Sequence, residues 1–439
     1  TALADLITAI HAGQTTMRDM VSTPTFRVGP PFDEALLPMP ERFIGREAEL
    51  AWVKRRLRQG GATSITAVNG MGGIGKTTLA AVAVHELKWE GRFGQGIVVL
   101  NCAEKRDAAD CEMLLHDILA RFDPQINLPV RADLAALRDL VGERLTGRDA
   151  LIVLDNVEPQ FAIGSLVAPL REAGLTLLLT ARQFLPEAAV PPPARLPLGL
   201  LSTADALTLF LQSAGRSTAH DYEGLTAADF DAAKRIVTAL ERHTLGVKLA
   251  GAYAATLGRT LAGVADEIER DLFDIPEDET PRKVEAVIAR SVEALPPDGR
   301  RLFAALAGFG TKEFGRKAAL ALAEALYLPD PRATLDLLAR RALLEAYVDV
   351  SLPEDADCER VRLHPLIQLF TQNLFSSAQT LDAARAYTAR RAIALWYSDY
   401  CERSDSELVV DEENLISAFL SAVTTLRDDD VAVKIAVYM

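Results

Sequence analysis

The sequence predicts a multidomain protein in which a parallel α/β sheet is followed by a long series of helices. Two observations support this fold class. Short apolar runs without regular alternation recur between residues 64 and 199, separated by helical patterns, as expected of strands buried on both faces of a parallel sheet. After about residue 200 these runs stop, and helical patterns dominate the rest of the 439 residues. A chain of this length is enough for about three domains.

The elements follow in order along the chain. Apolar spacing predicts a helix over residues 1–20, and five prolines within residues 22–43 mark an extended linker. The predicted strands are 64–69 (SITAVN), 96–101 (GIVVLN), 150–155 (ALIVLD) and 175–180 (LTLLLT), with 194–199 (ARLPLG) as a fifth candidate. The predicted helices between them include 110–122 and 134–145. This alternation is typical of a doubly wound sheet with helices on both faces.

Helices follow the sheet, and Ser202 is the predicted N-cap of the first of them. They continue to about residue 275, where the charged, proline-containing stretch DIPEDETPRK marks a boundary. Three helical patterns then precede two short extended pieces, 342–350 and 358–364, and a further helix. Helix, helix, helix, hairpin and helix is the order of a winged helix. Beyond residue 376 helices return, as expected at the start of a helical-repeat array.

Composition excludes several broad classes of protein. Apolar residues make up 49% of the chain and charged residues 25%, which is ordinary for a globular protein with several buried cores. The net charge of −14 disfavours a chain that coats nucleic acid or an anionic membrane. No apolar run reaches the roughly 18 residues that a membrane span needs, and the N-terminus lacks the pattern of a secretory signal. We therefore expect a cytoplasmic protein.

The cysteines support the same location. Cys102, Cys111, Cys358 and Cys401 are scattered and show no C-x-x-C spacing, so reduced thiols are expected rather than disulfides or a metal cluster. The chain begins with Thr1 rather than methionine, which is expected of a processed chain or of a piece of a longer protein.

One motif carries the chemistry. The stretch GMGGIGKT, residues 70–77, fits G-x-x-x-x-G-K-[ST] in full and lies between a predicted strand and a predicted helix. Its glycines let successive backbone N–H groups turn toward one anion, and the helix N-terminus adds its positive dipole end. Lys76 is suited to neutralise the β- and γ-phosphates, and the Thr77 hydroxyl to bind Mg²⁺. The motif therefore predicts nucleotide binding.

The partner of the magnesium site is expected at the end of another strand. Asp155 closes the buried run ALIVLD, and a carboxylate at the carboxyl edge of a parallel sheet faces the ligand crevice. Asp155 is therefore the predicted Walker-B ligand of Mg²⁺. Asn156 stands where many active hydrolases place a second acid, and a neutral amide cannot take a proton from water. We expect slow hydrolysis.

A third strand end adds a cation. LTLLLTAR closes with Thr180 and Arg182. Because a guanidinium pairs with phosphate oxygens through two parallel hydrogen bonds, Arg182 is predicted to detect the third phosphate of a bound nucleotide.

These motifs, in this order, resemble the STAND nucleotide switches, and in particular the NB-ARC branch of that class. The stretch RFIGREAEL, residues 42–50, is similar to the h-h-G-R-E-x-E signature of the family. The resemblance implies that this leader folds over the adenine, with Ile44 and Arg46 in contact with it. The resemblance covers roughly residues 40–375.

Two further stretches carry the resemblance and depart from it at one residue each. RHTLGVKLAG, from residue 242, resembles the G-x-P region of the family, where a proline packs on the adenine or ribose; here His243 fits and Thr244 replaces the proline. VRLHPLIQLF, from residue 361, is similar to the M-H-D motif, with Pro365 in place of the aspartate. The resemblance implies that His364 touches the β-phosphate of ADP.

Five regions are predicted: an N-terminal helix and Pro-rich linker (1–40), a P-loop nucleotide-binding domain (41–199), a helical domain (200–277), a winged-helix domain (278–375), and the start of a helical arm or sensor region (376–439). The predicted catalytic residues are Lys76, Asp155 and Arg182. The predicted nucleotide-binding residues are Ile44, Arg46, Gly72, Gly73, Ile74, Gly75, Lys76, Thr77, Thr78 and His364, and the predicted Mg²⁺ ligands are Thr77 and Asp155.

The resemblance implies a signal-transduction switch that binds ADP or ATP and has at most a weak ATPase activity. A closed monomer locked by ADP would exchange it for ATP when an inducer binds, and would then self-associate. The C-terminal helices are the expected sensor, and the sequence does not identify the inducer.

Two alternatives remain open. In the first, the protein is an ATP-dependent DNA-binding transcriptional regulator whose winged helix reads a groove with Arg340 and Arg341, although acidic residues surround them and DNA binding needs a basic face. In the second, it is a motor or transport ATPase with steady turnover. Asn156 and the lack of any pore or membrane segment count against that reading.

Overall fold

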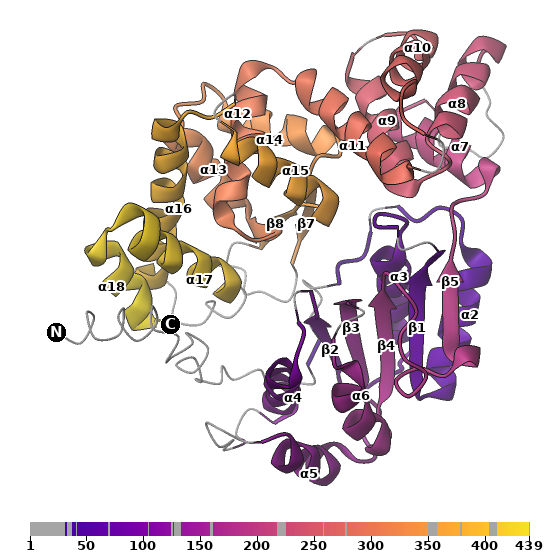
Figure 1. Cartoon of the computed structure of the whole chain (residues 1–439), viewed down its shortest axis with the longest axis vertical. Helices are drawn as coiled ribbons and strands as arrows, with labels where there is room; N and C mark the ends of the chain where they lie inside the picture. Colours follow the sequence, from indigo (N-terminus) through magenta and orange to yellow (C-terminus); the bar gives the residue numbers. More distant parts are fainter. Residues whose placement is uncertain are drawn as a thin grey trace. The chain divides into compact units, whose positions relative to one another are not determined.

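The computed structural model falls into two compact units, each described by itself here (Figure 1). The sheet unit takes its described residues from 31–209 and 241–245, and the helical unit from 210–240 and 246–438. The residues that the structure describes are 31–32, 37–40, 42–68, 71–103, 105–123, 126, 133–158, 161–216, 225–257, 259–276, 279–349, 358–377, 380–403 and 411–438.

The sheet unit is built on five parallel strands in the order β2-β3-β4-β1-β5. The strands are β1 (Ala62–Ala67), β2 (Ile97–Asn101), β3 (Leu151–Val157), β4 (Thr176–Ala181) and β5 (Arg195–Leu198). The helices are α2 (Glu47–Gln59), α3 (Lys76–Trp89), α4 (Ala108–Phe122), α5 (Leu134–Leu145) and α6 (Ile163–Glu172), with the short 3-10 turn η4 (Pro192–Ala194). All five predicted strands and the parallel α/β class are confirmed.

The apolar runs form strands here because both faces of the sheet are covered. Alternate residues of the strands, such as Ile152 and Leu154, pack with α4, α5 and α6 in one core. The residues between them, such as Leu151 and Val153, pack with α2 and α3 in a second core. A strand that is apolar at every position therefore loses no exposed face to water, which explains the lack of alternation in the sequence.

The order of the strands gathers the chemistry-bearing residues at one edge. β1 pairs with β4, where Ile65 lies opposite Thr180. β4 in turn pairs with β3, where Leu154 lies opposite Leu179. Because all strands are parallel, the loop after β1 and the carboxyl ends of β3 and β4 lie side by side.

The helical unit begins within α7 (Thr203–Ser213). Ser202 is the N-cap of α7, and its hydroxyl accepts a hydrogen bond from the N–H of Asp205 at 3.1 Å, as predicted. The later helices are α8 (Ala227–Ala239), α9 (Thr244–Leu257), α10 (Leu261–Leu272), α11 (Thr280–Glu293), α12 (Pro297–Ala305), the 3-10 turn η5 (Leu306–Phe309), α13 (Arg316–Ala325), α14 (Pro331–Arg340), α15 (Pro365–Ser376), α16 (Ala383–Arg403), α17 (Glu412–Ser421), the π-helical turn η6 (Ala422–Leu426) and α18 (Asp429–Tyr438).

A small antiparallel sheet interrupts these helices. Its strands are β6 (Glu313–Gly315), β7 (Glu345–Val348) and β8 (Glu359–Arg362), in the order β6-β8-β7. The two extended pieces expected from the sequence are β7 and β8. The third strand, β6, was not predicted, because three residues carry too little pattern to separate a strand from a loop.

Some expectations lie outside the described residues. These are the N-terminal helix over residues 1–20, most of the proline-rich linker, Gly70 of the phosphate loop and the acidic loop at 351–357. The predicted boundaries after residues 277 and 375 both lie within the helical unit, so the division into five regions stays a prediction.

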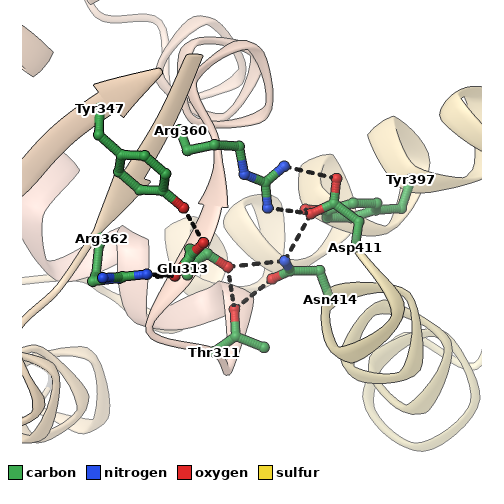
Figure 2. Close-up of polar contacts among 8 residues, drawn as sticks. All are labelled: Thr311, Glu313, Tyr347, Arg360, Arg362, Tyr397, Asp411 and Asn414. Atoms are coloured by element: carbon green, nitrogen blue, oxygen red, sulfur yellow. Dashed lines mark hydrogen bonds and ion pairs between the residues drawn. The ribbon is translucent and has the colours of Figure 1, made fainter. Parts of the chain in front are cut away.

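A buried polar network ties the small sheet to the C-terminal helices (Figure 2). Arg360 on β8 binds both carboxylate oxygens of Asp411, at 2.8 and 3.0 Å, and the two side chains are 2% and 0% exposed. Asn414 on α17 donates to Asp411 at 3.0 Å and to the backbone oxygen of Glu313 at 2.9 Å. Arg362 binds the carboxylate of Glu313. β8 is therefore joined to the start of α17 by charged and polar contacts shielded from water.

Two broad expectations can be compared with the fold. Cys102, Cys111, Cys358 and Cys401 form no disulfide. Within the described ranges, no helix combines the length and the apolar character that crossing a membrane requires.

Candidate functional site

The phosphate loop connects β1 to α3, as its motif predicts. Gly73 and Gly75 have φ angles of 74° and 98°, in the left-handed region that side chains rarely adopt. Gly75 is the N-cap of α3, so the loop ends at a helix N-terminus whose first N–H groups have no partner within the helix. This geometry suits an anion.

Lys76 is the first residue of α3 and is only 9% exposed. Its ammonium donates a hydrogen bond to the backbone oxygen of Met71 at 3.2 Å, so the side chain folds back over its own loop. A buried cation at the mouth of an anion-binding loop is in place to meet phosphate charge.

The next residue reaches the neighbouring strand ends. The Thr77 hydroxyl donates to the carboxylate of Asp155 at 2.8 Å, and the Thr180 hydroxyl donates to the same oxygen at 2.5 Å. Asp155 lies in β3 and is 5% exposed. A hydroxyl and a carboxylate in contact are hard oxygen donors that suit Mg²⁺, so the residues present fit the metal that the motif implies. Thr180 was not among the predicted site residues, since its contact depends on β4 lying beside β3.

Asn156 has a φ of 60°, which is uncommon for a residue with a side chain. Its side-chain amide donates to Asp155 at 2.9 Å, and its backbone N–H donates to the Thr180 hydroxyl at 3.0 Å. The amide of Asn156 therefore donates a hydrogen bond to Asp155, the candidate ligand of Mg²⁺, and it cannot act as a base.

The charges of Arg182 and Asp155 both act on the ammonium of Lys76. Arg182 is exposed, yet its positive charge is close enough to act on Lys76. Burial disfavours the ammonium and Arg182 repels it, while Asp155 opposes both effects, so the pKa of Lys76 falls from 10.5 to about 8. The ammonium form of Lys76 is therefore less stable in the empty site than in water, and a bound anion would stabilise it.

This lowered pKa predicts that binding of ADP, the expected ligand, takes up protons. Phosphate oxygens favour the ammonium, so the pKa of Lys76 rises in the complex. Above about pH 8 the complex then holds a proton that the free chain has released, and affinity should fall by up to about tenfold per pH unit. Calorimetry at pH 9 in two buffers of different ionisation enthalpy measures this uptake. In Lys76→Arg, whose side chain stays charged, the uptake should vanish; an unchanged uptake would assign the proton to another group.

The leader segment lies at the end of the last strand. Arg46 is the N-cap of α2, and its guanidinium donates to the backbone oxygen of Gly199 at 2.6 Å and pairs with Glu49 at 3.1 Å. Ile44 is half-buried beside it. A Cβ placed on Gly45 would lie 2.5 Å from the carboxyl carbon of Asp205. Only glycine fits there, so the leader is held against the chain that follows β5.

Residues 241–245 belong to the sheet unit, although α8 and most of α9 belong to the helical unit. Three hydrogen bonds join this segment to the phosphate loop. They link His243 Nε2 to the Gly72 oxygen (2.8 Å), the Leu245 N–H to the Gly73 oxygen (3.1 Å) and the Thr244 hydroxyl to the Ile74 oxygen (3.2 Å). Burial lowers the pKa of His243, so the neutral imidazole donates from Nε2 to the carbonyl.

His364 lies in the helical unit, apart in the chain from the other predicted site residues, which all belong to the sheet unit. It is the N-cap of α15, and its Nδ1 accepts a hydrogen bond from the N–H of Leu366 at 3.2 Å. An imidazole that accepts at Nδ1 carries its proton on Nε2. His364 therefore presents a donor rather than an acceptor at its outer nitrogen.

The chain is similar to known proteins over most of its length. The model of the NB-ARC domain matches residues 46–220. The chain is 31% identical over 345 residues to the regulatory protein AfsR of Streptomyces griseus, and 29% identical over 328 residues to the regulatory protein AfsR of Streptomyces coelicolor. These alignments cover 75% and 71% of this chain but only 32% and 29% of those proteins, so the chain spans about a third of their length.

A solved structure with a similar chain is that of a STAND (Signal Transduction ATPase with Numerous Domains) protein with a tetratricopeptide repeat sensor from Pyrococcus horikoshii. It is 15% identical, covers 91% of this chain and 56% of its own, and superposes with a TM-score of 0.46.

Proposed function

Because this chain carries an NB-ARC domain and is a P-loop NTPase of the STAND class, we propose that it is a signalling switch that holds ADP when closed and ATP when active. The observation that supports the proposal most directly is the contact of Thr77 with Asp155 beside the buried ammonium of Lys76. These three groups offer the hydroxyl, the carboxylate and the cation that a magnesium nucleotide needs.

Each residue has a separate task in this proposal. Lys76 meets the charge of the β- and γ-phosphates, and the loop N–H groups bind phosphate oxygens. Thr77 and Asp155 hold Mg²⁺, which supplies charge neutralisation between the phosphates when it is bound. Arg182, exposed at the end of β4, pairs with the third phosphate and so distinguishes ATP from ADP.

The proposal includes slow hydrolysis. A fast hydrolase needs a group that orients or deprotonates the attacking water. Asn156 occupies the position after the magnesium carboxylate and donates its amide to Asp155. We therefore assign the chain a weak ATPase activity that resets the switch rather than steady turnover.

The small sheet and the helices α12 to α14 form a winged helix in this proposal, and His364 follows its strand β8. With Nδ1 occupied by the Leu366 N–H, the outer nitrogen of His364 carries a proton suited to a phosphate oxygen. In the closed state His364 would donate to the β-phosphate of ADP. A nucleotide that binds the closed state more tightly than the open state would then favour the closed state.

This role predicts that His364→Ala releases ADP faster. Losing one hydrogen bond to a charged group costs about 1.5–3 kcal/mol, which corresponds to roughly a 10- to 150-fold higher dissociation rate. Stopped-flow displacement of a fluorescent ADP analogue measures that rate. His116→Ala, which removes a histidine from α4, should leave the rate unchanged. A wild-type dissociation rate in His364→Ala would remove this residue from the nucleotide.

Activation needs a path from a sensor to His364. The buried pair of Arg360 with Asp411 joins β8 to the start of α17 (Figure 2). Strand β8 ends two residues before His364. We propose that an inducer acting on the C-terminal helices displaces β8 through this pair and lowers the affinity for ADP. Exchange for ATP would then expose surfaces for self-association.

The experiment that tests the proposal is to denature the purified chain and identify the nucleotide that it releases. About one equivalent of ADP retained through gel filtration is the expected result. An empty site with fast, continuous turnover of ATP would instead indicate an ordinary P-loop ATPase.

One of the two arginines that a DNA-binding regulator would use, Arg341, is buried. Arg341 is 4% exposed, and its guanidinium donates to the backbone oxygens of Ser291 and Ala294 at 3.3 and 3.4 Å. A side chain that caps the end of a neighbouring helix in this way is not available to a DNA groove. Of these two arginines, Arg340 is the exposed one.

A further inference from the structure

Residues 243–245, which we call the clamp segment, bind the carbonyl groups of the phosphate loop. Its three hydrogen bonds reach three consecutive carbonyl groups, those of Gly72, Gly73 and Ile74. A Cβ built on Gly73 would lie 3.0 Å from the imidazole of His243 and 3.1 Å from the Cβ of Leu245. The clamp segment therefore packs directly on the loop as well as binding it.

The direction of these bonds decides which way the loop N–H groups point. In a trans peptide the C=O and the following N–H lie in one plane and point in opposite directions. Carbonyls that face the clamp segment therefore turn the N–H groups of Gly73, Ile74 and Gly75 to the opposite side. That side is where a phosphate must lie if the loop is to bind it through its N–H groups.

We propose that the clamp segment, through the imidazole of His243 and the hydroxyl of Thr244, is a positioning element that presents the loop N–H groups to phosphate. The inference rests on nucleotide binding by this loop. It assigns Thr244 a task on the phosphate side of the site, whereas the proline that the resemblance expects would contact the adenine or ribose and has no hydroxyl to donate.

The test compares two probes in two variants at Thr244. Thr244→Val keeps the shape and removes the hydroxyl, and Thr244→Ser keeps the hydroxyl. Affinities for ADP and for inorganic pyrophosphate are measured by competition against a fluorescent ADP analogue. Pyrophosphate has no base or ribose, so it reports on the phosphate loop alone. The valine variant should lose about 3- to 10-fold in affinity for both probes, and the serine variant should regain most of it.

Other outcomes would overturn the inference. A loss for ADP with unchanged pyrophosphate binding would place Thr244 on the base or ribose. No loss for either probe would show that the hydroxyl does not position the loop. Thr226→Val is the matched control, since Thr226 caps α8 through the N–H of Asp229 at 3.1 Å, and it should bind both probes as the wild type does.

A measurement on the nucleotide-free chain separates this inference from the proposed function. Hydrogen exchange of the amides at residues 72–76 should be faster in Thr244→Val than in the wild type or Thr244→Ser. If the wild type bound neither probe, the proposed function would fail, while exchange would still test the clamp segment. Unchanged exchange in the valine variant would overturn the inference by itself.

Discussion

Replacing Asp411 with alanine is expected to lower the free energy of unfolding of the helical unit by about 3–5 kcal/mol. The substitution leaves the guanidinium of Arg360, which is 2% exposed, without its carboxylate. It also removes an acceptor from Asn414 and from the hydroxyl of Tyr397. An uncompensated buried charge is costly because water cannot solvate it. Calorimetry should show a loss of roughly 2–4 °C in the unfolding temperature for each kcal/mol.

An exposed ion pair supplies the control for Asp411. Asp266 pairs with Arg235 at 2.7 Å, and their side chains are 59% and 38% exposed. Asp266→Ala should change stability by less than about 1 kcal/mol. A double variant, Arg360→Met with Asp411→Ala, should lose less than the sum of the two single losses, since it leaves no unpaired charge. An Asp411→Ala variant as stable as the Asp266→Ala control would contradict the importance of the buried pair.

Lys76→Met is expected to weaken ADP binding by about 30-fold to several thousandfold, equivalent to roughly 2–5 kcal/mol. The substitution keeps most of the apolar stem and removes the ammonium that folds over the loop toward the backbone oxygen of Met71. It should also stabilise the nucleotide-free chain, because burial lowers the pKa of Lys76 and so makes its charge unfavourable before a ligand arrives. Calorimetric titration and thermal unfolding of the empty protein measure the two opposite effects.

The control for this variant is Lys54→Met. Lys54 lies on α2 and pairs with Glu90 at 2.8 Å, so the same chemical change removes a charge from a helix without touching the loop. Its affinity for ADP should match that of the wild type. Binding by Lys76→Met within about threefold of the wild type would mean that the loop N–H groups carry the phosphate without the ammonium.

The parallel sheet could be predicted because strands that are buried on both faces appear in the sequence as continuous apolar runs. A strand such as β4, Thr176–Ala181, carries three leucines in succession and is buried at every position. The antiparallel sheet is harder, since β6 is only three residues long. Its existence depends on pairing with β8, where Phe314 lies opposite Val361, and no local pattern contains that partner.

The site was predictable where the chemistry is local. Lys76 and Thr77 belong to one motif, and Asp155 follows from its place at a strand end, although their roles stay predictions. Thr180 required the order of the strands. The buried pair of Arg360 and Asp411 could not be predicted, because in the sequence both look like ordinary surface charges in separate segments.

The contacts of Thr244 were hidden for a different reason. The residue was visible only as a departure from an expected proline. Its partner, the backbone oxygen of Ile74, offers no side-chain signal and lies 170 positions away. Backbone acceptors are the commonest partners of side-chain donors, and they leave no trace in residue identity.

The place of β1 at the interior of its sheet has a consequence for synthesis of the chain. β1 pairs with β4 and β5, which are both synthesised later. Ala62, for example, cannot pair until Leu177 has been made. A ribosome therefore releases the strand that supports the phosphate loop long before either neighbour exists. Non-local pairing of this kind slows folding, and unpaired strand edges invite aggregation. During that interval a chaperone that shields apolar strands would protect the nascent chain from aggregation.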